Sequence, residues 1–150
     1  MQLSDIISDL KLQVDDTAES PMLSADQYQS IVQRSLAKVN SYLGTVFQAQ
    51  AETVTPVPDP PTLDLILAQS LVYLSETMRA KVAKNYSFKS GDKSIDKTKQ
   101  PSFWADLHKD YLTRLKEILR SMAPHLDDAS SLLAVNSYPL PEIFEVSLDL

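Results

Sequence analysis

Hydrophobic residues recur at spacings of three and four in four stretches of the chain, and this periodicity predicts amphipathic helices. The first stretch covers residues 4–14 and ends in the polar segment 15–20. The second begins at Ser24, which forms a capping box with Gln27, and it ends at Gly44, a residue suited to a helix C-terminus. Each predicted helix has one apolar face: Leu3, Ile6, Ile7, Leu10 and Val14 in the first, and Tyr28, Ile31, Val32, Ser35, Leu36, Val39 and Leu43 in the second.

The third predicted helix, residues 63–86, is apolar nearly all round in its first half, so we expect it to be the central and most buried element. The segment 52–61 before it holds four prolines and predicts a stiff, extended connector, because proline is excluded from helix interiors. Pro61 suits a first helical turn, with Pro60 or Asp59 just before it.

A polar loop, residues 87–100, separates the third helix from the fourth, and residues 86–88 and 94–95 could pair there as a short hairpin. Pro101 opens the fourth helix and Pro124 stops it. Asp110 and Arg114 can form an i,i+4 ion pair on the outer side of this helix. Its predicted buried face consists of Phe103, Trp104, Leu107, Tyr111, Leu115, Ile118 and Met122.

The end of the chain has a different period. Residues 144–150 alternate strictly, with Phe144, Val146, Leu148 and Leu150 on one side and polar residues on the other. A lone strand must pair with an edge, so this pattern predicts an arm that adds a β-strand to a partner chain. The alternative is a frayed terminus, or one folded back on its own domain. We therefore expect an all-α fold, a four-helix bundle-like domain over residues 1–123 with an extended C-terminal arm over residues 124–150.

Composition excludes several classes of function. The 150 residues fit one domain, and no apolar run approaches the roughly 20 residues that span a bilayer. The chain has no cysteine, which excludes disulfide scaffolds, cysteine zinc sites and thiol catalysis. Its two glycines, Gly44 and Gly91, are too few for a Gly-rich phosphate loop. The two histidines, His108 and His125, have no motif around them, and we expect a helix-capping or surface role for both. No enzyme, cofactor or metal site is expected.

Charge is distributed unevenly along the chain. Residues 1–78 carry three basic and ten acidic side chains, residues 79–120 carry eleven basic and five acidic ones, and residues 121–150 carry five acidic and no basic ones. Complementary faces for packing on copies of the chain or on other proteins are therefore available. The alternative is that folding interleaves the charges. A second possibility is a nucleic-acid-binding module that uses the basic segment 79–99.

The loop before the fourth helix carries the most specific pattern in the chain. Residues 86–100 read Tyr-Ser-Phe-Lys-Ser-Gly-Asp-Lys-Ser-Ile-Asp-Lys-Thr-Lys-Gln, and an aromatic-led helix follows. This run resembles the head–tail connector (adaptor) proteins of tailed bacteriophages, in which a similar stretch lies between a long helix and the final helix. The order of the predicted elements also agrees, so the resemblance covers most of the chain.

The resemblance implies a structural virion protein rather than an enzyme. It implies a ring, usually twelvefold, that docks under the portal protein, extends the DNA channel without binding DNA specifically, and offers a platform for a neck, stopper or tail-completion protein. Assembly would take place in the host cytoplasm, with no membrane partner. A different neck or tail-completion ring is an alternative. The implied partner contacts are Phe88, Gly91, Asp92, Lys93, Ser94, Ile95, Asp96 and Lys97 in the loop, and Phe144, Val146, Leu148 and Leu150 in the arm.

Overall fold

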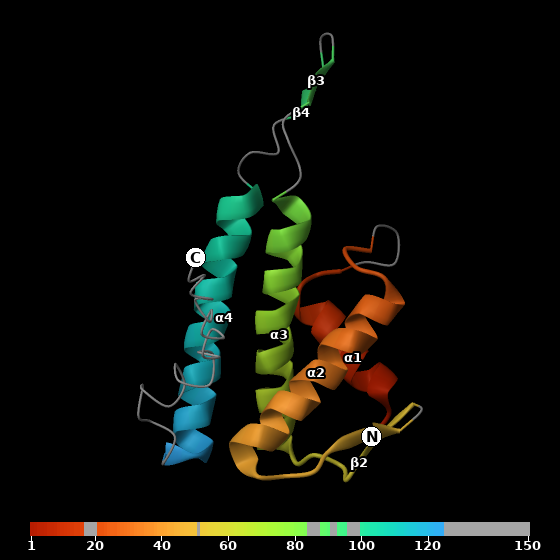
Figure 1. The fold of residues 1–150 in the computed structure, drawn as a ribbon, viewed down its shortest axis with the longest axis vertical. Coiled ribbons are helices and arrows are strands. Elements are labelled where there is room, and N and C mark those ends of the chain that lie inside the picture. Colours follow the sequence, from red (N-terminus) through yellow and green to blue (C-terminus); the bar gives the residue numbers. More distant parts are fainter. Residues whose placement is uncertain (17–20, 51, 84–87, 91–92, 96–99, 125–150) are drawn as a thin grey trace, which may run out of the picture.

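The computed structural model describes residues 1–16, 21–50, 52–83, 88–90, 93–95 and 100–124. These residues form four α-helices and two short antiparallel β-hairpins, so the described part of the chain is mostly helical, as the hydrophobic periodicity predicts. Figure 1 shows α3 and α4 side by side, with α2 and α1 on the other side of α3. The predicted C-terminal arm lies outside the described residues, apart from its first residue, Pro124.

The first two helices match the predicted ones closely. Helix α1 spans Leu3–Gln13 and α2 spans Ala25–Leu43. The capping box of α2 is confirmed, because the Ser24 Oγ accepts a hydrogen bond from the Gln27 N–H at 3.3 Å and the Gln27 Oε1 accepts one from the Ser24 N–H at 2.9 Å. Gly44 ends α2 with a φ of 65°, in the left-handed region that favours glycine.

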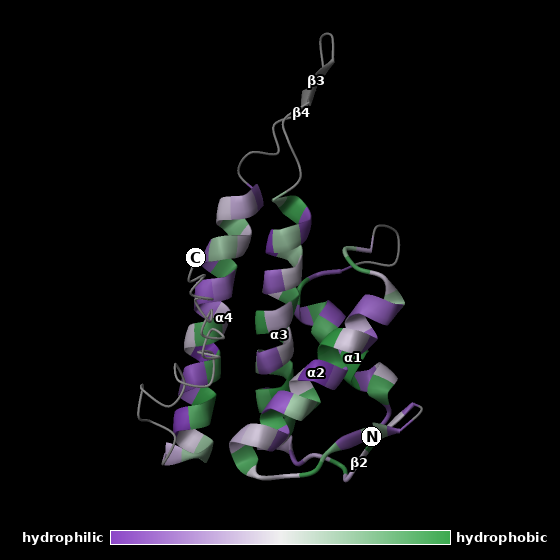
Figure 2. Cartoon of the chain, viewed as in Figure 1, coloured by the Kyte–Doolittle hydropathy of each residue, from purple (hydrophilic) through white to green (hydrophobic). Residues whose placement is uncertain are grey.

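Helix α3, Pro60–Val82, is the central element of the fold, as expected. Thirteen of its residues are buried, whereas α1 and α2 bury only one face each. The Asp59 side chain caps its start by accepting a hydrogen bond from the Thr62 N–H at 3.2 Å. Buried polar groups on this helix have partners: the Ser70 hydroxyl donates to the Ile66 carbonyl at 2.8 Å. The hydrophobic residues in Figure 2 gather where the neighbouring helices face α3.

The predicted extended connector over residues 52–61 is only partly correct, whereas Pro61 lies in the first turn of α3 after the Asp59 cap, as expected. Strand β2, Thr53–Thr55, pairs antiparallel with β1, Gln48–Gln50, and α3 already begins at Pro60. The reason is that the prolines begin only at residue 56, so residues 53–55 keep their backbone donors, and Val54 between two exposed threonines is buried. The chain start pairs with the other edge of β2, where the Val54 N–H donates to the Met1 carbonyl at 2.9 Å.

Helix α4, Gln100–Met122, packs mainly against α3. Because one neighbour covers only a narrow strip of a helix, few of its side chains are fully buried. The predicted face is therefore only partly correct: Trp104 and Leu115 are buried, while Phe103 is 57% exposed. Leu119, which the prediction omitted, is buried instead. The other predicted positions are half-buried, namely Leu107, Tyr111, Ile118 and Met122.

A second hairpin lies between α3 and α4 in the sequence. Strands β3, Phe88–Ser90, and β4, Lys93–Ile95, pair antiparallel, so a hairpin forms in the loop as the sequence allowed, with its first strand two residues later than residues 86–88. Figure 1 shows this hairpin beyond the ends of α3 and α4, away from the body of helices.

Candidate functional site at the α3–α4 end

Four of the predicted partner-contact residues lie in the β3–β4 hairpin. The register places Phe88 opposite Ile95 and Ser90 opposite Lys93, with Ser94 opposite Lys89. The two described strands of the segment that carries the family resemblance thus lie at one end of the molecule, beyond α3 and α4 (Figure 1). The remaining predicted contacts lie outside the described residues: Gly91, Asp92, Asp96, Lys97, Phe144, Val146, Leu148 and Leu150.

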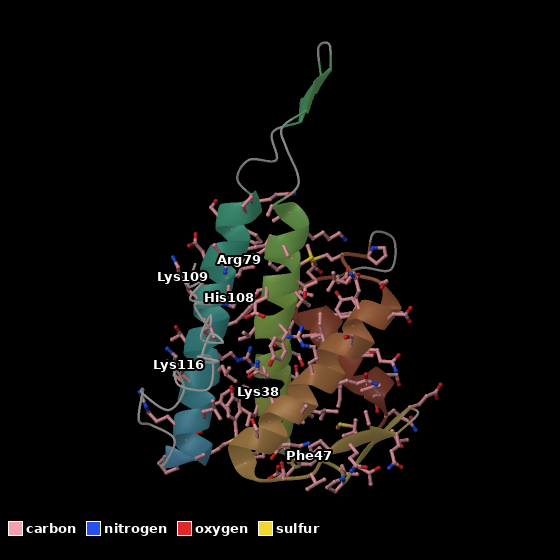
Figure 3. All side chains as sticks on the ribbon, in the orientation of Figure 1. Lys38, Phe47, Arg79, His108, Lys109 and Lys116 are labelled. Atoms are coloured by element: carbon pink, nitrogen blue, oxygen red, sulfur yellow. The ribbon has the colours of Figure 1, made fainter. Side chains whose placement is uncertain are left out.

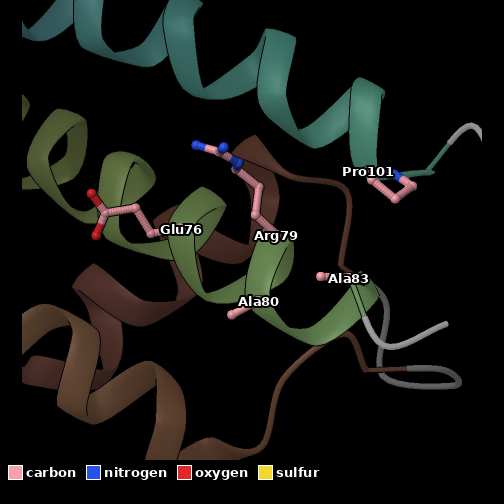
Figure 4. Close-up of a pocket in the computed structure, with 5 residues that line it drawn as sticks. All are labelled: Glu76, Arg79, Ala80, Ala83 and Pro101. Atoms are coloured by element: carbon pink, nitrogen blue, oxygen red, sulfur yellow. The ribbon is translucent and has the colours of Figure 1, made fainter.

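An open hollow lies at the same end of the molecule, where α3 ends and α4 begins. Its volume is about 390 Å³, and it is lined by Glu76, Arg79, Ala80 and Ala83 from α3 and by Pro101 from α4. Figure 4 shows Arg79 extending from α3 toward α4, with Pro101 at the start of the facing helix. Sequence reasoning missed this hollow, because it depends on how far apart the two helix ends stand.

Two basic side chains of α3 have different surroundings at this end. The Lys81 ammonium donates a hydrogen bond to the Met22 carbonyl at 2.5 Å and so ties α3 to the segment before α2. Arg79 is exposed, and its guanidinium has no hydrogen-bond or ion-pair partner among the described residues. Both residues lie in the last turn of α3, where positive charge is favoured by the helix dipole. Among the described residues of the α3 end, the Arg79 guanidinium can therefore make a further contact.

Two neighbouring aromatic residues near the start of α4 differ in their exposure to solvent. Trp104 is buried, whereas Phe103 is 57% exposed. The two rings meet edge to face, with centroids 5.7 Å apart and an interplanar angle of 77°. Trp104 therefore anchors α4 to the core and holds Phe103 at the surface.

His108 does not have the surface or capping role that we expected. Its Nδ1 lies 2.8 Å from the Ser75 Oγ, and the side chain is half-buried between α4 and α3 (Figure 3). The Ser75 hydroxyl is fully buried and is also 2.7 Å from the Val72 carbonyl, so this Ser–His pair links two helices. The signal for this position was present, because His108 lies four residues after Trp104 and three before Tyr111 in the apolar stripe. His125 lies outside the described residues.

In residues 1–78, the acidic part of the chain, each basic side chain lies over a tyrosine ring. The Arg34 guanidinium lies 4.4 Å from the centre of the Tyr73 ring. The other two basic residues of positions 1–78 behave in the same way, with Lys11 over Tyr28 at 5.1 Å and Lys38 over Tyr42 at 5.2 Å. The carboxylates of α1 and of the start of α3 are exposed, namely Asp5, Asp9, Asp59 and Asp64. This side of the molecule therefore keeps an acidic surface.

Helix α4 carries little of the basic excess of residues 79–120. The predicted Asp110–Arg114 pair does not form, because the Arg114 Nη1 donates to the Gln13 Oε1 of α1 at 3.2 Å. Lys109 pairs with Asp106 at 3.5 Å on the outer side of α4, where Figure 3 also shows Lys116. With four basic and three acidic side chains in this helix, most of the positive charge falls in residues 79–99, at the hollow and in the hairpin segment.

The described residues contain neither a candidate metal site nor a candidate membrane span. No group of three or more His, Asp or Glu side chains there could hold a metal ion, and none of the described helices is apolar enough over sufficient length to cross a bilayer. No protein-family model, curated protein or solved structure matches this chain.

Proposed function

We propose that this chain is a head–tail connector (adaptor) protein, a structural subunit that forms a ring under the portal of a tailed bacteriophage. The observation that carries the proposal is the β3–β4 hairpin, which lies beyond the helix ends and coincides with the segment that resembles the connector loop (Figure 1). An isolated two-stranded hairpin is marginally stable in water. A neighbouring chain that packs against it would supply the missing partner surface.

In this proposal the four helices act as a bundle-like domain over residues 1–123, and residues 124–150 act as an arm that adds a strand to the portal or to another partner. The ring extends the DNA channel of the virion neck and provides a platform for a stopper or tail-completion protein. The hairpin residues Phe88, Lys93, Ser94 and Ile95 contact a neighbouring subunit or neck protein. The DNA passes through the ring without sequence-specific binding.

The charge distribution supports a ring built by head-to-tail contacts. Exposed carboxylates such as Asp5, Asp9 and Asp64 lie on α1 and at the start of α3. Half of the basic residues, Arg79 among them, belong to the other end of α3 and to the segment that follows it in the sequence. A contact between unlike faces closes into a ring when the rotation between copies allows it. Opposite charges at the surface attract less at high salt, so we expect ring formation to weaken as salt rises.

The direct test is the mass of the purified full-length chain, alone and mixed with the purified portal ring of its phage. We expect a monomer alone and a ring-sized complex with the portal. A chain that ignores the portal but shifts in mass on duplex DNA at physiological salt would contradict the proposal and favour the nucleic-acid-binding alternative. A chain that forms a ring only with another neck component would assign it to a different neck or tail-completion ring.

The arm is tested separately with two matched variants. The first replaces the apolar positions Phe144, Val146, Leu148 and Leu150 with Ser, and the second replaces the alternating polar positions Glu145, Ser147 and Asp149 with Ala. Loss of portal binding in the first variant and retention in the second would support strand addition through the apolar side. The role of the arm would be contradicted if both variants bound the portal as tightly as wild type. The same holds if a chain that lacks residues 136–150 bound it as tightly.

A further inference from the structure

The first turn of α4 presents a large aromatic side chain that the described residues leave exposed. Phe103 is 57% exposed, and it is the aromatic member of the large exposed hydrophobic residues that the described part of the chain contains, the others being Leu12, Val46 and Val57. Single exposed aliphatic residues are normal on protein surfaces. A phenylalanine held edge to face against a buried tryptophan is a rigid projection, and aromatic side chains of this kind are enriched at protein interfaces.

The hollow at the end of α3 is a suitable receptor for an aromatic ring. Ala80 and Ala83 are exposed and have short side chains, so they leave a shallow apolar floor beside Pro101. The Arg79 guanidinium lines the same hollow without a partner among the described residues. Glu76 also lines it, and a carboxylate is compatible with the positive edge of an aromatic ring while a cation is compatible with its face.

The two features are on different sides of α4 and cannot meet within one chain. Successive residues of an α-helix are turned by about 100°, so Pro101 and Phe103 point roughly 200° apart. Pro101 faces the hollow, and Phe103 therefore projects on the opposite side of the helix. With Phe103 on one side of α4 and the hollow on the other, identical chains can join head to tail, each inserting its ring into the next copy.

We propose that Phe103 of one copy inserts into the hollow of the next copy, between Ala80 and Ala83, with the Arg79 guanidinium over its ring. This inference rests on the proposed function, because it names the contact that joins neighbouring subunits of the ring. Contacts between a cation and an aromatic ring also occur within the chain, where three other basic side chains lie 4.4 to 5.2 Å from tyrosine ring centres. One aromatic ring in one hollow buries far less than the roughly 1,200 Å² of a stable interface, so the contact acts together with others in the assembly.

Cysteine cross-linking tests the contact directly, because the chain has no cysteine of its own. One full-length copy carries Asp106→Cys, an exposed position one turn from Phe103 on the same side of α4, so that Phe103 itself is kept. A second copy of different mass, made distinct by a tag, carries Ala80→Cys. We expect a disulfide-linked species with the summed mass of the two chains when the two samples are mixed with the portal ring and oxidised. The control pair combines Ala80→Cys with Thr113→Cys, an exposed position farther along α4. Equal yields from the two pairs would overturn the inference.

A second measurement separates this contact from the proposed function. Phe103→Ala removes an exposed side chain, so we expect unchanged circular dichroism and thermal unfolding but a several-fold loss of ring formation on the portal. Rings that form normally with Phe103→Ala, without selective cross-linking, would overturn the contact and leave the connector proposal standing. A wild-type chain that forms no oligomer, alone or on the portal, and gives no selective cross-link would overturn both.

Discussion

The Nδ1 of His108 lies 2.8 Å from the Oγ of Ser75, and this hydrogen bond joins α4 to α3 within a seam that is otherwise largely apolar. The serine hydroxyl is fully buried and also lies 2.7 Å from the Val72 carbonyl. Because α4 has α3 as its main neighbour, a polar link at this position contributes to the docking of the whole helix.

A double-mutant cycle should detect this link. Ser75→Ala and His108→Ala each remove one partner, and we expect a coupling free energy of about 1 kcal/mol between them, the net value of a typical hydrogen bond. Urea unfolding of the four proteins in the cycle measures it. Ser70→Ala is the matched control, because the Ser70 hydroxyl bonds within α3. Its effect on the free energy of unfolding should therefore add to that of His108→Ala. Additivity in the Ser75 cycle would show that the link contributes nothing.

Asn40 holds the turn between α2 and β1, and its removal should be costly. Its Oδ1 accepts a hydrogen bond from the Phe47 N–H at 2.7 Å, and its Nδ2 donates to the Phe47 carbonyl at 2.8 Å. We expect Asn40→Ala to lower the free energy of unfolding by roughly 2 kcal/mol, since two backbone groups lose their partner. Asn40→Asp keeps the acceptor but sets a carboxylate oxygen against the Phe47 carbonyl, so it should not restore the stability of wild type. A chemical denaturation series measures both, and an Ala variant as stable as wild type would contradict the assignment.

Buried tyrosines should make the protein less stable in strong alkali. Burial raises the pKa of Tyr42 to about 12, and the neighbouring Tyr73 adds to the rise. Burial also raises the pKa of Tyr28, where Asp16 accepts the hydrogen bond of the phenol. The unfolded chain releases these protons near pH 10, before the folded chain does, so the free energy of unfolding should fall as pH rises from about 10 toward 12.

Unfolding measured between pH 8 and pH 12 checks this dependence. Tyr42→Phe cannot ionise and should fall less steeply than wild type over the same range. Identical slopes for the two proteins would show that Tyr42 has the same pKa in both states. Absorbance titration of the folded protein near 295 nm gives an independent reading, because the phenolate of Tyr42 should appear only near pH 12.

Gly44 has space for a larger side chain, but its backbone conformation is unfavourable for residues other than glycine. A Cβ built at this position meets no heavy atom within 4 Å, yet the residue has a φ of 65°. We expect Gly44→Ala to cost about 1 kcal/mol through backbone strain alone. Gly44→Asn should cost less, because asparagine tolerates the left-handed conformation at a helix end. Thermal unfolding distinguishes the two variants, and equal losses would point to a steric cause instead.

The elements that sequence reasoning predicted best are those whose signals are local. The capping box of Ser24 with Gln27, the glycine at the end of α2 and the long apolar run of α3 each depend on residues within a few positions of one another. The β1–β2 hairpin was missed because its strands are three residues each, too short for a period to stand out, and because the nearby prolines suggested a connector.

The candidate site shows the same division. The loop segment was identified in the sequence through its resemblance, and residues 86–88 and 94–95 were expected to be able to pair there. The described strands 88–90 and 93–95 agree with a hairpin at this place. The hollow beside it could not be predicted, because Arg79 and Pro101 are brought together only by the packing of α3 on α4. The exposure of Phe103 could not be predicted either, since a periodic pattern does not say how wide a strip of a helix its neighbour covers.

The sequence by itself determined the four helices, their order and the caps of α2, because hydrophobic period, proline and glycine act through the local backbone. It also determined the uneven charge of the three parts of the chain. Only the tertiary structure decided which apolar residues stay exposed, that His108 turns inward to Ser75, and that the basic side chains of the acidic part lie over tyrosine rings. These features depend on distances between elements far apart in the sequence, and packing sets those distances.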